Sequence, residues 1–277
     1  MLSSVLFVGL LHLAACSSDE KPAEPVKPAE PAEPAGPPKL DKATLEAAAE
    51  NVALVPSPAE MQKALDKAGI ATGLSSMVSD RALKMDIENK DVIAVRTGVA
   101  MADALLTVKD APPEKLTARL ATVKAGMTAL GGGADIAATI DDINARVTNN
   151  SVSREDLVKE LDEMHGAIIP EIKFEAGERA VPLIQAGSWL EGSNLVSAAI
   201  VAANNTTAGT ELLRQPQVAD YFLKYVEVEG AGKAPDEVLK QLHGTLTKLK
   251  EIASKPTLSI DDVKEVKSQT DAVLALL

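Results

Sequence analysis

Cysteine is nearly absent, since the chain of 277 residues has only Cys16. One thiol cannot form an intramolecular disulfide, and it cannot supply the ligands of a cysteine-based metal cluster. We therefore expect neither structural disulfides nor a Cys-based metal site.

Histidine is also scarce, with three residues in the chain. Asp162 and His165 are three residues apart on one predicted helix, a spacing that would present two ligands to a metal ion. A di-iron helical bundle needs further carboxylates and a second Glu-x-x-His pair, and the sequence around His243 has none. We therefore expect no metal and no cofactor.

Aromatic residues are few, with one Trp, two Tyr and three Phe. Such a composition lacks the stacking platforms expected for sugars or single-stranded nucleic acid. The formal net charge is −12, whereas phosphate binding needs clustered Lys and Arg. The sequence therefore argues against nucleic acid as a partner.

Common catalytic signatures are missing as well. The chain has no Gly-x-Ser-x-Gly nucleophile elbow and no strands to hold one. The glycines at 131–133 lack the Gly-Lys-Ser/Thr continuation of a phosphate loop and are typical of a helix end followed by a turn. We expect no enzymatic activity and assign no catalytic residue.

The first fifteen residues contain no Asp, Glu, Lys or Arg. Their apolar run, from Val5 to Ala15, is too short to span a bilayer and is typical of a signal peptide. It ends in Leu13-Ala14-Ala15-Cys16, which resembles the lipobox of bacterial lipoproteins. The resemblance implies that residues 1–15 are removed and that Cys16 carries the lipid that attaches the protein to a membrane of the bacterial cell envelope.

One feature departs from the lipoprotein pattern, because no Lys or Arg follows Met1, where a positive charge is usual. A start codon further upstream would explain this. Ser17 follows the cysteine, and by resemblance to enterobacterial sorting rules the lack of Asp there favours the outer membrane. The face of that membrane stays open.

Prolines recur at every third position between Pro22 and Pro37. Polyproline II has three residues per turn, so this spacing places the prolines on one edge of a stiff, solvated segment. The alternative interpretation is a disordered spacer. In both cases residues 16–40 form a tether between the lipidated cysteine and the domain.

From residue 41 onward the apolar residues follow helical spacing, and no stretch has the alternation of a strand. We predict an all-α domain over residues 41–277, with about ten helices in one bundle or in two stacked halves. The segments around residues 149–153 and 204–207 are interpreted as loops. The predicted helices are 41–53, 57–69, 90–108, 113–130, 134–147, 153–175, 179–203, 216–228, 236–254 and 259–277.

Two of these helices, 90–108 and 179–203, are apolar nearly all round, which indicates burial. Arg96, Asp103 and Glu191 lie near their middles, so neither helix is a membrane span. Small residues, among them Gly98 and Gly192, indicate that neighbouring backbones approach closely here. We expect these two helices to form the centre of the domain.

The second central helix contains Gly187-Ser188-Trp189-Leu190-Glu191-Gly192. Together with Val55-Pro56-Ser57-Pro58 upstream, this run resembles a group of uncharacterised bacterial all-helical proteins. The resemblance implies a shared helical domain without an assigned activity.

The candidate polar core consists of Glu191, Trp189, Arg96, Asp103 and Asn194. An apolar setting would raise the pKa of Glu191, which could then act as an acid or bind a ligand. We favour a structural ion pair with Arg96 or Arg179, because buried charges persist when they are paired.

Three functions are compatible with these observations. The first is a non-enzymatic lipoprotein whose domain docks an envelope protein or supports the envelope. The second is a carrier or sensor of a small apolar ligand held between the central helices. The third and least favoured is a hydrolase that acts through Glu191 or through the Asp162–His165 pair.

Overall fold

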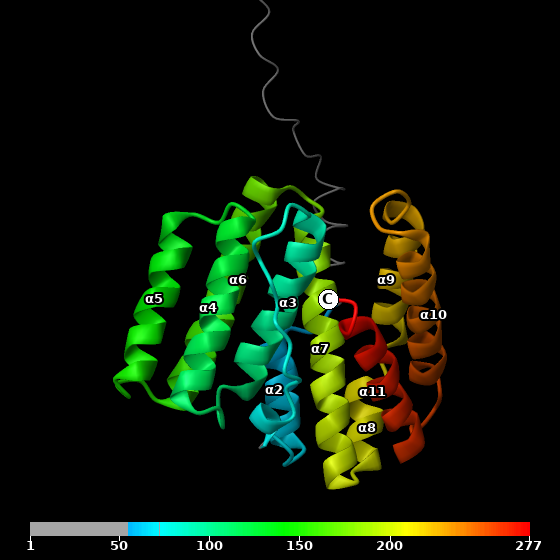
Figure 1. Cartoon of the computed structure of the whole chain (residues 1–277). Helices are drawn as coiled ribbons and strands as arrows, with labels where there is room; N and C mark the ends of the chain where they lie inside the picture. Colours follow the sequence, from blue (N-terminus) through cyan, green and yellow to red (C-terminus); the bar gives the residue numbers. More distant parts are fainter. Residues whose placement is uncertain (1–54, 72) are drawn as a thin grey trace, which may run out of the picture. The chain divides into compact units, whose positions relative to one another are not determined.

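A computed structural model describes residues 55–71 and 73–277, apart from the side chains of residues 168–170. The predicted signal peptide, Cys16, the tether and the helix at 41–53 lie outside the described residues. Within them the chain forms ten α-helices and one 3₁₀ turn, without any strand (Figure 1). The prediction of an all-α multi-helix bundle is therefore confirmed.

The helices and the 3₁₀ turn η1 have these bounds: α2 Pro58–Lys67, η1 Leu74–Ser76, α3 Lys90–Thr107, α4 Pro113–Ala129, α5 Ala134–Thr148, α6 Arg154–Ala176, α7 Ala180–Ala203, α8 Thr206–Leu213, α9 Pro216–Glu229, α10 Asp236–Ala253 and α11 Ile260–Leu274. Most ends lie within two residues of the predicted ones. Ser57 and Ser259 both form capping boxes at the starts of α2 and α11, and Gly131 adopts a positive φ just after α4.

The central helices α3 and α7 pack directly against each other and run parallel. Arg179, just before α7, pairs with Asp91 in the first turn of α3 at 2.8 Å. A Cβ atom on Gly98 would lie 1.9 Å from the carbonyl oxygen of Ile184, and one on Gly187 would lie 2.0 Å from that of Val95. Glycine is therefore required at both positions for the two backbones to touch.

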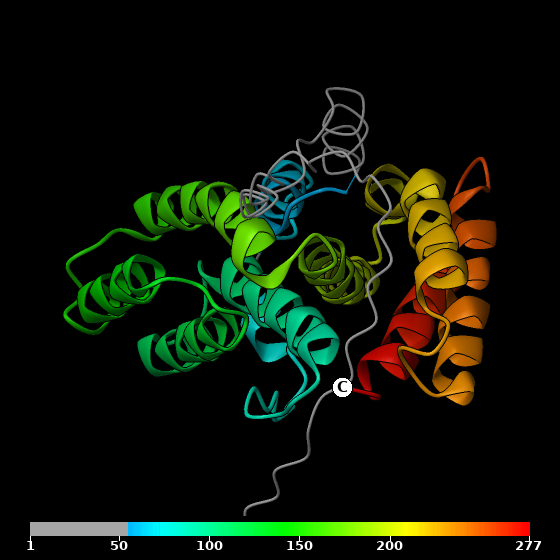
Figure 2. The ribbon, with the colours of Figure 1, turned by 90° about the horizontal axis from the view of Figure 1, so that it is seen from above.

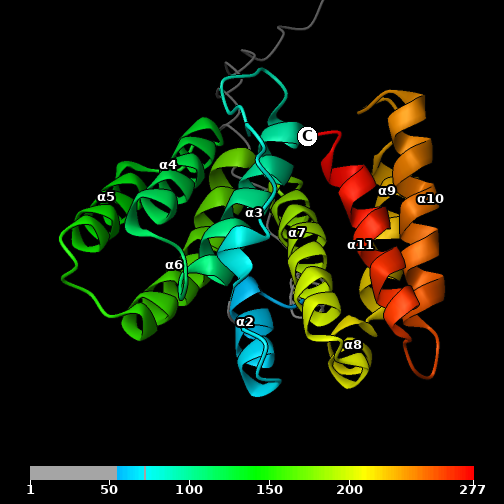
Figure 3. The same cartoon turned by 60° about the horizontal axis from the view of Figure 1, so that its bottom comes forward.

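Buried apolar side chains form two hydrophobic clusters, and both include residues of α3 and α7. Figure 2 shows α4 and α5 on one side of the α3–α7 pair and α9 and α10 on the other. One cluster is formed with α4, α5 and α6, and the other with α2 and α8 to α11. In Figure 3, α2 and α8 lie beside the lower part of α7. Gly192 of α7 faces the sulfur of Met61 of α2. Burial of α3 and α7 confirms what their all-round apolar pattern predicts.

One helix differs from the prediction. Residues 204–207 are interpreted from sequence as a loop, but α8 begins at Thr206. The Asn205 side chain accepts from the backbone N–H of Ala208 and so caps the helix, while Asn204 has a positive φ of 51° and ends α7. The eight residues of α8 are too few for a clear apolar periodicity.

Candidate functional site

Glu191 lies in the centre of the domain and has no exposed surface. Its Oε2 lies 2.5 Å from Nη2 of Arg81, which comes from the segment between η1 and α3. The expectation of an ion pair is confirmed, but the predicted partners Arg96 and Arg179 are wrong. A long connecting segment, which carries no periodic signal, supplies the positive charge instead.

The two arginines expected to pair with Glu191 have other contacts. Arg96 donates to the backbone oxygens of Lys84, at 2.7 Å, and Leu277. Arg179 bridges Asp91, at 2.8 Å, and Glu229, at 2.7 Å. Both guanidinium groups therefore connect separate segments at the edge of the α3–α7 pair.

Asp103 lies beside Glu191 and is 7 % exposed. Burial and the neighbouring Glu191 carboxylate raise the pKa of Asp103 well above its ordinary value, which favours the protonated form of its carboxyl group. Asp103 also lines a polar cleft of about 260 Å³, together with Arg81 and Arg119. The sequence-predicted residues Asp103 and Glu191 thus form one buried acidic pair.

Trp189 and Asn194 hold α7 to its neighbours. The Trp189 ring packs on Phe222 of α9 with centroids 5.4 Å apart, and its Nε1 donates to Oε1 of Gln215 at 3.3 Å. Nδ2 of Asn194 donates to Oδ1 of Asp271 at 2.6 Å and to Oγ1 of Thr270 at 3.0 Å, both on α11. The predicted polar residues therefore do not converge on a single site.

The histidines make no metal cluster within the described residues, where no group of three or more His, Cys, Asp or Glu is placed to hold an ion. Asp162 pairs with Lys63 at 3.2 Å. Burial lowers the pKa of the half-buried His165, which favours its neutral form. His243 contacts Glu227 at 3.1 Å.

An apolar groove of about 330 Å³ lies between the α3–α7 pair and helices α9, α10 and α11. Its position differs from the one expected, because α3 and α7 touch and leave no space between them at Gly98 and Gly187. Apolar side chains make up most of its lining: Val92, Val95, Leu183, Ala186, Trp189, Leu190, Phe222, Val226, Val238, Leu239, Leu242, Leu246, Val273, Leu276 and Leu277.

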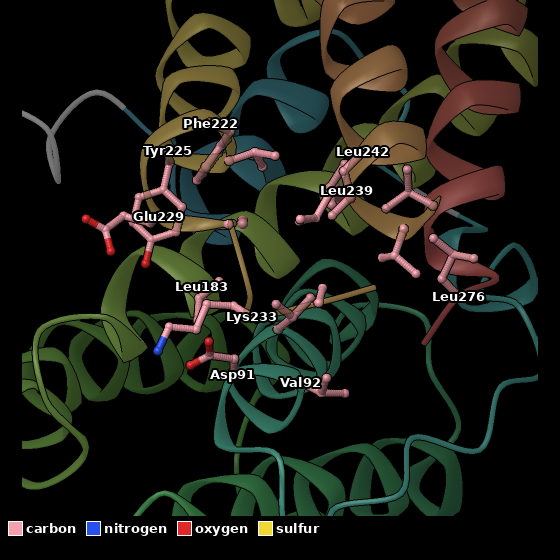
Figure 4. Close-up of a pocket in the computed structure, with 18 of the residues that line it drawn as sticks. Asp91, Val92, Leu183, Phe222, Tyr225, Glu229, Lys233, Leu239, Leu242 and Leu276 are labelled. Atoms are coloured by element: carbon pink, nitrogen blue, oxygen red, sulfur yellow. The ribbon is translucent and has the colours of Figure 1, made fainter. Parts of the chain in front are cut away.

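Polar groups gather at one end of this groove. Figure 4 shows Asp91, Tyr225, Glu229 and Lys233 on one side of the view, whereas Leu239, Leu242 and Leu276 lie on the other. The groove therefore has a polar end and an apolar end.

The Tyr225 hydroxyl is part of the polar end. Its Oη is buried and has no hydrogen-bond partner among the described residues. Burial raises the pKa of this hydroxyl to about 12, so it remains a proton donor at neutral pH. A buried donor without a partner is costly unless a ligand or water satisfies it.

Sequence reasoning identified Trp189, which lines the groove, but missed Arg81, Tyr225 and Lys233. The helical spacing of the leucines in residues 236–254 predicts an apolar face on α10. That face is the same whether it packs on protein or lines a groove, so periodicity alone could not identify the groove.

No helix in the described part of the chain is both long enough and apolar enough to cross a membrane. Comparisons of the chain with protein-family models, with curated proteins and with solved structures found no match.

Proposed function

We propose that this protein is a lipid-anchored, non-enzymatic binding protein of the bacterial cell envelope, whose helical domain holds a small apolar molecule in the groove beside α7. The groove is the observation that carries the proposal. Ligand sites are concave, mostly apolar and about 300–1,000 Å³ in volume, with a few polar groups that fix orientation. The docking of an envelope protein, the other non-enzymatic function expected from sequence, stays a prediction.

The composition of the groove supports a small molecule as occupant. Leu239, Leu242 and Leu246 face it from α10, and Trp189 and Leu190 face it from α7. Burial of apolar ligand surface against such side chains is favourable by roughly 25 cal/mol per Å². Because the groove is formed by packed helices, a ligand would enter a site that is already shaped.

The location in the envelope rests on Cys16 and is tested separately. Cells that produce the wild-type chain and Cys16→Ser are fractionated, and the mass of the purified protein is measured. We expect the wild type in the membrane fraction, cleaved before Cys16 and carrying acyl chains, which together anchor stably. An unmodified thiol, or retention of residues 1–15, would refute the lipoprotein assignment.

Ligand binding is tested with N-phenyl-1-naphthylamine, a neutral apolar dye whose emission rises in apolar surroundings. We expect saturable binding to the full chain. Leu242→Asp places a carboxylate in the groove and should weaken binding at least tenfold, because an unpaired charge is costly in apolar surroundings.

Leu223→Asp is the matched control. Leu223 is also a partly buried leucine at the edge of the same hydrophobic cluster, but it does not line the groove. It should leave dye affinity unchanged in protein whose circular dichroism remains helical. Equal loss of binding in the two folded variants, or no saturable binding to the wild type, would contradict the proposal.

A further inference from the structure

The polar end of the groove contains hydrogen-bond donors that the fold leaves unused. Oη of Tyr225 and Nε of Arg179 are both buried without a hydrogen-bond partner among the described residues. Nε of Arg179 can only donate, whereas the Tyr225 hydroxyl can donate or accept, so an acceptor is the one group that would satisfy both. Few buried donors in folded proteins lack a partner, and such groups often mark a ligand or water position.

The charges at this end also favour an anion. Asp91 and Glu229 are already paired with Arg179. The Arg179 guanidinium also lies over the ring of Tyr225, so the four side chains form one cluster. Lys233 is exposed and has no ion-pair partner in the part of the chain that the structure describes. A cationic group would have to compete with Arg179 for its carboxylates, whereas an anion can pair with Lys233 without displacing any contact.

The volume of the whole groove limits the length of the chain that it can accept. A water-sized group takes about 30 Å³, so about 330 Å³ holds on the order of ten methylene-sized groups. Leu239, Leu242 and Leu276 lie along this end (Figure 4). An unbranched alkyl chain would contact apolar side chains over its whole length.

From these observations we infer that the groove binds a single-chain amphiphile with a carboxylate head. The carboxylate accepts hydrogen bonds from Tyr225 and pairs with Lys233, and the alkyl chain extends toward Leu276. The inference rests on the proposed function and adds the class of ligand and its orientation. The acidic net charge of the protein opposes anions at long range, but at physiological salt this field is screened beyond about 8 Å.

The test compares two probes with the same chain length, dodecanoate and dodecyltrimethylammonium, each below its micelle concentration. Binding to the full chain is followed by the emission of Trp189, the single tryptophan, which lines the groove, and by displacement of N-phenyl-1-naphthylamine. We expect dodecanoate to bind roughly tenfold more tightly than dodecyltrimethylammonium, because one charge-assisted hydrogen bond contributes a difference of about that size.

Two substitutions examine the head position. Tyr225→Phe and Lys233→Gln should each weaken dodecanoate binding several-fold, and together by roughly tenfold or more, without changing the affinity for the neutral dye. The matched controls Tyr221→Phe, one helical turn earlier, and Lys240→Gln, an exposed lysine of α10, do not line the groove. They should leave both affinities unchanged.

The outcomes separate this inference from the proposed function. If the dye binds but dodecyltrimethylammonium binds as tightly as dodecanoate, or if the Tyr225 and Lys233 variants have wild-type affinity for dodecanoate, the carboxylate inference is overturned while apolar binding stands. If neither the dye nor dodecanoate binds, the proposed function itself fails.

Discussion

Nη2 of Arg81 lies 2.5 Å from Oε2 of Glu191, a carboxylate with no exposed surface at the centre of an apolar helix. The arginine side chain is itself only 15 % exposed. The two charges stabilise each other, because an isolated charge in this setting would be strongly destabilising. Oδ1 of Asp103 lies farther from the same guanidinium group, at 3.9 Å from Nη2.

Glu191→Ala should lower the free energy of unfolding by about 3–5 kcal/mol, because it removes the carboxylate 2.5 Å from the buried Arg81 guanidinium and leaves only Asp103, whose Oδ1 lies 3.9 Å away. Thermal and urea denaturation measure the change. Asp261→Ala is the control, since the exposed Asp261–Lys264 pair at 2.8 Å should contribute less than about 1 kcal/mol. An unchanged melting curve for Glu191→Ala would remove the structural role and support a ligand role.

Asp103 should make the stability depend on pH. Its pKa is raised in the folded protein, so the protonated form is favoured there. The stability that this raised pKa contributes is fully present below the ordinary pKa of aspartate, near 3.8. It is lost as pH rises through the pKa that Asp103 has in the folded protein. The stability of the wild type relative to Asp103→Asn should therefore fall as pH rises above about 4.

Urea denaturation of both proteins across a series of pH values measures this difference. Asn cannot titrate, so the Asp103→Asn protein provides the baseline for all other groups. A difference that stays constant with pH, or that grows as pH rises, would contradict the assignment of a protonated Asp103.

Gly98→Ala should be strongly destabilising, by several kcal/mol, because its Cβ would lie 1.9 Å from the backbone oxygen of Ile184. Gly244→Ala is the matched control in the exposed part of α10, where nothing lies within 4 Å of an added Cβ. It should stabilise the protein by about 0.5–1 kcal/mol, through the higher helix propensity of alanine. Equal effects of the two substitutions would show that α3 and α7 do not touch.

Asn194→Ala should loosen α11 by removing the hydrogen bonds to Thr270 and Asp271. We expect the free energy of unfolding to fall by about 1–3 kcal/mol. Hydrogen exchange should speed up in α11 while α4, which packs on the opposite side of α3, keeps its wild-type rates. Faster exchange in both helices would indicate a global effect instead.

The sequence predicted helices well where strong local signals mark them. Ser57 and Ser259 supply caps, and the leucines of α10 recur at helical spacing, so these elements follow from neighbouring residues. The buried position of Glu191 was also predictable, because its helix has no polar face. Its need for a counter-charge follows from the physics of buried ions.

The identity of that counter-charge could not be predicted in the same way. Arg81 lies 110 positions before Glu191, in a segment without secondary-structure signals, whereas Arg96 lies on a helix that the sequence places next to the one with Glu191. The groove could not be predicted from sequence for a related reason. Whether Leu242 contacts another helix or an open space depends on how α9 and α10 are placed, which local pattern does not specify.

The contact of α3 and α7 at Gly98 and Gly187 gives the groove two walls of different mechanical character. On one side, the backbones of α3 and α7 already touch, and Oγ of Ser188 donates to the Gly98 carbonyl at 2.9 Å. These two helices therefore cannot move closer together. On the other side, α9 and α10 form a hairpin that packs on α11 and is joined to the start of α7 by Arg179. We therefore expect ligands of different width to be accommodated by tilting of this hairpin, while the α3–α7 side of the groove keeps its position.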